Sequence, residues 1–152
     1  MRLNYVVWQE GVNPFVVVEL LSPGTEDEDL GRTTRDSNSP PTKWEVYEQI
    51  LRVPYYVLFD RYTDQLRAFG LVNARYQELD TSKQRVWMEE VKLGLGLWYG
   101  TFQGIERLWL RWYDAEGNWI LTDTEQLAQV EARAEKLAQK LKELRIDPDQ
   151  VG

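Results

Sequence analysis

The stretch Pro14-Phe15-Val16-Val17-Val18-Glu19-Leu20-Leu21-Ser22-Pro23-Gly24-Thr25 decides the fold. Its β-branched, apolar run is too short for a good helix and lies between two prolines, so it predicts a buried strand. Alternation along a strand places Glu19 on one face with Phe15 and Val17. A buried carboxylate is costly unless a partner compensates it. Glu19 is therefore either a ligand for a divalent cation, or a residue near a sheet edge that is solvated or paired with an arginine.

A predicted helix and a second predicted strand follow this stretch. Trp44, Tyr47 and Leu51 are spaced i, i+3, i+7, which is one face of a helix. Thr42 precedes this segment and is a suitable N-cap. The next strand is Tyr55–Asp60. The order strand, loop, helix, strand predicts a crossover unit whose two strands are parallel or part of a mixed sheet.

The second half of the chain has the pattern of short antiparallel strands. Turn-forming residues separate the candidate strands. These are Leu66–Val72, Arg75–Leu79, Val86–Val91, Leu108–Tyr113 and Asn118–Leu121. Together with the first half, they predict an α/β or α+β protein: a mixed β-sheet flanked by helices, followed by late hairpins.

The tail predicts one long helix from about residue 123 to residue 145. Its apolar residues follow a 3-4-3-4-3 spacing, which is the a/d seam of a heptad repeat. They are Leu127, Val130, Ala134, Leu137, Leu141 and Leu144. Thr122 and Glu125 have the spacing of a capping box. We expect a domain over residues 1–121 and a helix over 122–152, which either pairs with a second copy, giving a homo-oligomer, or packs back on the domain.

Composition excludes several classes of site. The 152 residues include no cysteine and no histidine, which removes disulfides, thiolate zinc, histidine ligands and histidine triads. A bound metal must be held by oxygen atoms, which favours magnesium, manganese or calcium. The formal charge of −7 gives no general attraction to polyphosphate, so a DNA contact needs a local basic patch. No signal peptide or membrane span is visible, and we expect a soluble, cytoplasmic protein.

Several polar residues near the first strand could carry chemistry. Ser22 could donate a hydrogen bond to a phosphate or simply form the turn, and Asp29 lies in an acidic run typical of a solvated loop. Lys43 and Tyr47 are i, i+4 on the predicted helix. A lysine near a carboxylate-held metal can orient the attacking water, although a solvated lysine at a helix start is the simpler interpretation. Asp60 closes its strand and favours a structural role in the turn.

Four tryptophans cluster late, and we interpret them as packing residues rather than as a surface that stacks bases or sugars. They are Trp98, Trp109, Trp112 and Trp119. Alternation places Leu108, Leu110 and Trp112 on one face of a strand and Trp109 and Arg111 on the other. The nearby Leu93-Gly94-Leu95-Gly96-Leu97 lacks the features of a phosphate-binding loop.

An ordered series of motifs resembles a known family. The series is Pro14 to Thr25, then Asp29, Lys43 and Tyr47, then Pro54-Tyr55-Tyr56-Val57-Leu58-Phe59-Asp60. It is similar to the Uma-two family of restriction endonucleases, in the PD-(D/E)XK nuclease superfamily, over roughly residues 8–76. The resemblance implies a restriction-endonuclease-like core and a Mg²⁺- or Mn²⁺-dependent cut of DNA phosphodiester bonds.

The resemblance also implies roles for individual residues. Glu19 matches the strand carboxylate that binds the metal, with Asp29 as a second candidate ligand. Lys43 is the candidate catalytic lysine, because the usual lysine position of the motif holds Leu21. Ser22 and Tyr47 match recurrent positions that we assign to substrate binding.

The chain departs from the family pattern at one decisive position. Phe15 occupies the position at which the motif has its first aspartate. The only acid upstream of Glu19 is Glu10. We therefore expect a chain that lacks the family's N-terminal region and has an incomplete metal site. The sequence predicts either a metal-dependent endonuclease, inactive if that carboxylate is essential, or a non-catalytic interaction module that self-associates through its C-terminal helix.

Overall fold

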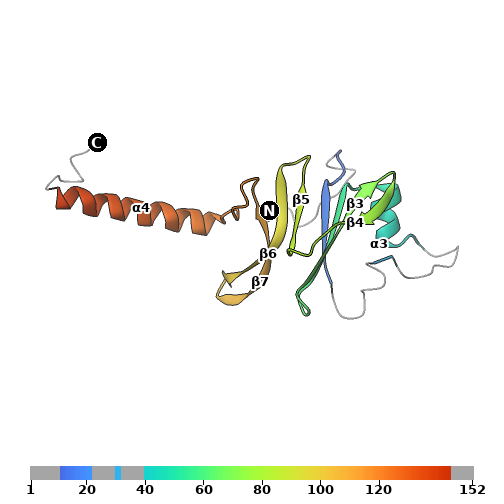
Figure 1. Cartoon of the computed structure of the whole chain (residues 1–152), viewed down its shortest axis with the longest axis horizontal. Helices are drawn as coiled ribbons and strands as arrows, with labels where there is room; N and C mark the ends of the chain where they lie inside the picture. Colours follow the sequence, from blue (N-terminus) through green and yellow to red (C-terminus); the bar gives the residue numbers. More distant parts are fainter. Residues whose placement is uncertain (1–10, 22–29, 32–39, 145–152) are drawn as a thin grey trace. The chain divides into compact units, whose positions relative to one another are not determined.

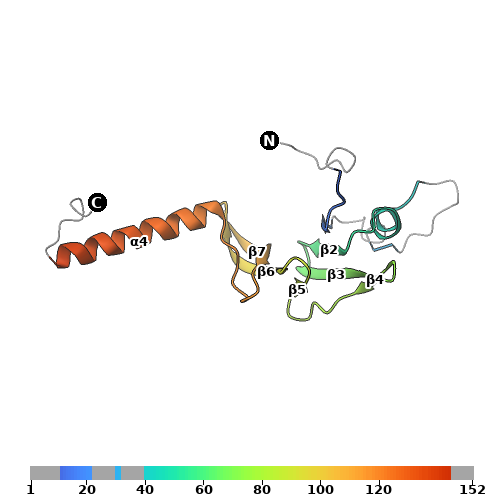
Figure 2. The same cartoon turned by 90° about the horizontal axis from the view of Figure 1, so that it is seen from above.

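The computed structural model describes residues 11–21, 30–31 and 40–144. The candidate residues Ser22 and Asp29 lie outside the described residues. The chain separates into two compact units, residues 1–118 and residues 119–152, and each is considered by itself. Figure 1 and Figure 2 show the strands in the first unit and one long helix in the second.

The first unit contains a mixed four-stranded sheet, called sheet A. Its strands, in spatial order, are β1 (Val16–Leu20), β2 (Tyr55–Asp60), β3 (Gln65–Val72) and β4 (Arg75–Glu78). β1 and β2 are parallel, and the other neighbours are antiparallel. The crossover predicted from the order strand, loop, helix, strand is confirmed, and the architecture is α+β.

A second, antiparallel sheet follows, called sheet B. Its strands are β5 (Arg85–Met88), β6 (Leu93–Phe102) and β7 (Ile105–Tyr113). The sequence did not predict β6, because glycines interrupt the apolar alternation. These glycines make room for aromatic rings: a Cβ on Gly94 would lie 2.0 Å from the Tyr113 ring, and one on Gly100 would lie 2.2 Å from the Trp98 ring. The strand predicted at Asn118–Leu121 is wrong, since only Trp119 forms an isolated bridge there.

Sheet A has a hydrophobic core on each face. The first core joins sheet A to sheet B and contains Val57, Phe59, Leu66, Ala68, Val86, Met88, Leu95 and Leu97. The second contains Leu21, Tyr56, Leu58 and Phe69, and a short helix covers it. Leu108, Leu110 and Trp112 pack against the first core, as alternation predicted. Phe15 also packs there, so its predicted place on the Glu19 face is wrong; it precedes β1, and strand alternation does not extend to it.

The short helix has two parts. α3 (Lys43–Glu45) continues into the π-helical turn η1 (Val46–Ile50). Thr42 and Glu45 form a reciprocal capping box, which satisfies backbone N–H groups at the start of the helix. The Trp44 ring meets the rings of three residues of sheet A edge-on: Tyr56, Phe69 and Tyr76. These contacts fix α3 and η1 on the second core.

The second unit contains α4 (Asp123–Glu143), which the heptad pattern predicted. The predicted capping box between Thr122 and Glu125 is present. All residues of α4 are described, and none is buried. The seam is largely exposed: Leu127 by 59%, Val130 by 65%, Leu137 by 53% and Leu144 by 69%. In the described part of the chain, no helix is both long enough and apolar enough to span a membrane.

Candidate active site

The side chain of Glu19 projects from β1 onto the face of sheet A that carries the short helix. Its strand neighbours on that face, Val17 and Leu21, belong to the second core. Glu19 lies near the end of β1, where the open end of a parallel pair commonly carries functional groups. Its side chain is 22% exposed, so the carboxylate is partly screened from water but still accessible.

Two residues of the short helix converge on the Glu19 carboxylate. The Tyr47 hydroxyl donates a hydrogen bond to Oε1 at 2.9 Å. The Lys43 ammonium lies 3.5 Å from Oε2. The i, i+4 spacing predicted that Lys43 and Tyr47 share one helix face, and the structure brings both to the strand carboxylate. Glu19 is therefore paired, with a lysine and a tyrosine rather than with an arginine.

The pairing of Lys43 with Glu19 is weak enough to be rearranged. The lysine side chain is 43% exposed. Ion pairs at such exposure contribute about 0–1 kcal/mol, because water screens the charges and long side chains lose rotamer entropy. The site is therefore a partly exposed strand carboxylate with a partly exposed lysine beside it.

The orientation of Tyr47 is set by packing and by the residue that follows it. Its ring lies 5.2 Å from the Tyr56 ring, centroid to centroid. The adjacent Glu48 is only 4% exposed, and it accepts hydrogen bonds from the Tyr76 N–H at 2.8 Å and from Arg75 Nη1 at 3.0 Å. These bonds attach η1 to β4. They hold the helix face that carries Lys43 and Tyr47 against the sheet.

The pKa of Glu48 lies below its usual value of 4.5. Burial alone would raise the pKa, but hydrogen bonds from the Tyr76 N–H, Gln49 and Arg75, together with the charge of Arg75, outweigh that effect. Glu48 is therefore an ionised structural carboxylate. Sequence analysis missed it, since a glutamate on a short helix is typical of a solvated face, and its partners lie 27 and 28 residues away.

Asp60, at the end of β2, has the structural role expected for it. Oδ2 accepts a hydrogen bond from the Thr63 hydroxyl at 2.6 Å, and Oδ1 accepts one from the Tyr62 N–H at 2.8 Å. The Thr63 bond, followed by the Tyr62 bond, lowers the pKa of Asp60. Its carboxylate closes the turn between β2 and β3.

Glu19 is the carboxylate of the site that could bind a magnesium ion. Among the described residues there is no group of three or more acidic side chains that could hold a metal ion. Magnesium is commonly held by one or two carboxylates, with water and substrate phosphates filling its other positions. Tyr47 and Lys43 each contact one oxygen of Glu19, and a carboxylate has about four lone-pair sites, so lone pairs remain for an ion. Glu19 thus fits the lower limit of a magnesium site.

The first unit is an α+β fold that brings a strand carboxylate, Glu19, together with a lysine and a tyrosine of the adjacent helix. The family model for Uma2, described as "Putative restriction endonuclease", matches residues 2–103. This match covers more than half of the chain, and the chain therefore belongs to the Uma2 family. Neither the curated proteins nor the solved structures include a significant match.

Proposed function

We propose that this protein hydrolyses phosphodiester bonds in DNA with the help of a divalent metal, Mg²⁺ or Mn²⁺. The observation that carries the proposal is the convergence of Lys43 and Tyr47 on the Glu19 carboxylate, in a chain of a restriction endonuclease family. In this proposal the reaction depends on all three residues. Glu19 supplies an acid on a strand, and Lys43 and Tyr47 supply a cation and a hydroxyl on one helix face.

Glu19, with Asp29 as a second ligand, would hold the ion. When bound, such an ion polarises a phosphoryl oxygen and makes a bound water more acidic. The chain supplies no histidine or cysteine, so a hard cation with oxygen ligands is the one that suits it. The single described carboxylate is consistent with a site that gains affinity from the substrate phosphate.

The other residues have separate roles in this scheme. Lys43 would orient the attacking water and offset the negative charge that develops on the phosphate. The resemblance implies substrate binding for Tyr47, but its hydroxyl donates to Glu19 Oε1, so Tyr47 would orient the carboxylate. Ser22, two residues after β1 in the sequence, would donate a hydrogen bond to a substrate phosphate oxygen.

Nicking of supercoiled plasmid DNA by the full chain tests the proposal. We expect Mg²⁺-dependent nicking, with a loss of at least about 100-fold in Glu19→Ala, since a missing metal ligand removes several kcal/mol of transition-state stabilisation. Lys43→Ala should lower the rate by about 10- to 100-fold. The controls are Glu116→Gln and Lys83→Ala, which change exposed residues of turns. Nicking that is equal in Glu19→Ala and in the wild-type chain would refute the assignment.

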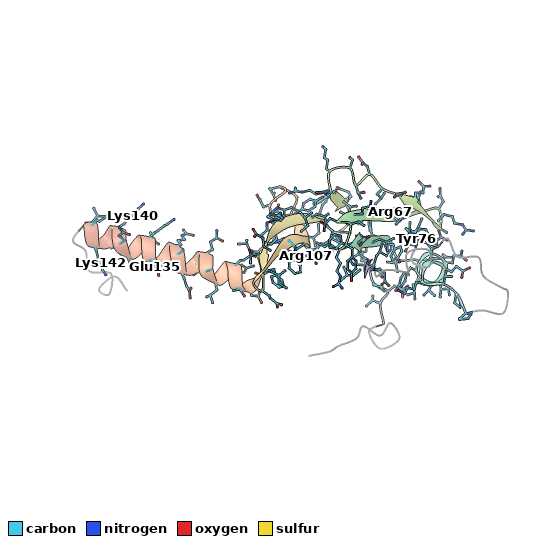
Figure 3. All side chains as sticks on the ribbon, turned by 90° about the horizontal axis from the view of Figure 1, so that it is seen from below. Arg67, Tyr76, Arg107, Glu135, Lys140 and Lys142 are labelled. Atoms are coloured by element: carbon cyan, nitrogen blue, oxygen red, sulfur yellow. The ribbon has the colours of Figure 1, made fainter. Side chains whose placement is uncertain are left out.

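A second candidate function is a protein-interaction module that self-associates through α4. It is favoured by the exposed heptad seam, from Leu127 to Leu144. The regular a/d spacing is self-complementary, so a second copy of α4 is the partner that fits it. Figure 3 shows Lys140 on one side of α4 and Glu135 and Lys142 on the other. Light scattering on the full chain tests this candidate, and a monomer at high concentration would contradict it.

A further inference from the structure

The register of sheet A places an arginine in the same row as Glu19. Glu19 is opposite Leu58, and Leu58 is opposite Arg67 on β3. Leu58 belongs to the second core, on the helix face of the sheet, and so does Phe69, two residues after Arg67. Because side chains alternate along a strand, Glu19, Leu58 and Arg67 all project from that face. The acid and the arginine are two strands apart, which is about 10 Å between their Cα atoms.

The guanidinium of Arg67, which is labelled in Figure 3, is held in place by Glu78 and Phe69. Its Nε donates a hydrogen bond to Glu78 Oε1 at 2.7 Å. Its central carbon lies 5.1 Å from the centroid of the Phe69 ring. In the described part of the chain the ion pair with Glu78 engages Nε, and the guanidinium carries further N–H donors on its two η nitrogens. The side chain is 27% exposed, which leaves the group accessible to a partner from solution.

We propose that Arg67 binds a phosphate of the DNA strand, about three nucleotide steps from the phosphate that would lie at Glu19. This inference rests on the proposed nuclease function. A chain with a net charge of −7 cannot attract DNA over its whole surface, so the site must supply its own positive charge. A guanidinium binds phosphate through paired N–H donors, and one that is already oriented loses little entropy on binding.

The separation of the two charged residues is compatible with one nucleic-acid strand. About 10 Å corresponds to about three nucleotide steps, because one strand of DNA rises by about 3.4 Å per phosphate. Leu58, between the two charged residues, is 1% exposed and belongs to the second core, so the DNA strand would contact the partly exposed ends of the row rather than Leu58.

The test measures how binding depends on salt. Anisotropy of a fluorescent DNA duplex is titrated with the full chain in metal-free buffer, at several salt concentrations. The variants are Arg67→Ala, Arg67→Lys and the control Lys83→Ala, which removes an equal charge from an exposed turn. Losing one phosphate contact should weaken binding about tenfold and reduce the slope of log K against log salt by about 0.9. Arg67→Lys should retain the slope and lose part of the affinity, and Lys83→Ala should match the wild-type chain.

The outcomes separate the two proposals. The role of Arg67 is overturned if a folded Arg67→Ala variant keeps the salt slope of the wild-type chain. The nuclease function then stays in place, provided that the wild-type chain binds DNA and its nicking depends on Glu19. Absence of both binding and nicking in the wild-type chain overturns both proposals. If Arg67→Ala is not folded by circular dichroism, the comparison uses Arg67→Lys, and an affinity equal to that of the wild-type chain then counts against the inference.

Discussion

Replacing Glu48 with glutamine tests how the structure holds the helix that carries Lys43 and Tyr47. The substitution preserves size but removes the charge of a side chain that is 4% exposed. It weakens the bonds from the Tyr76 N–H and from Arg75, and it places an amide NH₂ where a carboxylate oxygen accepted a hydrogen bond. The helix should remain, because Trp44 still packs on sheet A, but its attachment to β4 should loosen.

The size of the effect follows from the two bonds. A hydrogen bond to a charged group contributes about 1.5–3 kcal/mol when buried. The bond from the Tyr76 N–H belongs to this class. The Arg75 side chain is 71% exposed, so its pairing adds only about 0–1 kcal/mol. We therefore expect Glu48→Gln to lower the free energy of unfolding by about 2 kcal/mol, which moves the urea midpoint by about 1 M.

The effect of Glu48→Gln should depend on pH. The pKa of Glu48 is lowered in the folded protein from its usual value of 4.5. Its contribution to stability is therefore fully present above the unfolded pKa and is lost as the pH falls through the folded pKa. The difference between the wild-type chain and Glu48→Gln should be constant from about pH 6 to 8. It should shrink as the pH falls below the usual value of 4.5 and through the lowered pKa of the folded protein.

The assay is urea unfolding followed by tryptophan fluorescence, at a series of pH values. Glu116→Gln is the control, because that glutamate is exposed in a turn. Equal midpoints for the wild-type chain and Glu48→Gln at pH 7 would refute the structural role of the carboxylate. A difference that does not change with pH would show that its ionisation is unimportant.

Two further predictions concern sheet B and α4. Gly94→Ala should lower the free energy of unfolding by about 2 kcal/mol, because the new Cβ would overlap the Tyr113 ring. The loss should be smaller in a Tyr113→Ala background. If the shifts in urea midpoint of the two single variants add up in the double variant, the prediction is contradicted. Leu137→Asp should weaken self-association at least 100-fold, since a carboxylate in an apolar seam costs about 3 kcal/mol or more. Light scattering measures the molar mass, and Glu135→Gln on the other side of α4 is the control. Equal masses for the wild-type chain, Leu137→Asp and Glu135→Gln would contradict the prediction.

Much of sheet A could be predicted, because its signals are local. The β-branched run before Ser22 and the run Tyr55–Asp60 predicted two strands, and their order around a helix predicted the parallel pair. Strand alternation and the i, i+4 spacing also predicted which faces Glu19, Lys43 and Tyr47 occupy. The contact among these three residues followed from packing one amphipathic helix on one sheet face.

Other features could not be predicted, because they depend on residues far apart in the sequence. The π-helical turn at Val46–Ile50 has no local signature. The burial of Glu48 depends on Arg75 and Tyr76, which join it only when β4 forms. β6 was missed because its glycines carry no pattern until the Trp98 and Tyr113 rings are in place. Arg67 was not a candidate, since its row with Glu19 requires the register of three strands.

The most direct test of the central claim is the Mg²⁺ dependence of plasmid nicking by the full chain and by Glu19→Ala. The account predicts that nicking rises with Mg²⁺, stops with EDTA, and falls at least about 100-fold without the Glu19 carboxylate, while Glu116→Gln retains the wild-type rate. Nicking that persists in Glu19→Ala, or a wild-type chain that does not cut DNA at any Mg²⁺ or Mn²⁺ concentration, would contradict it.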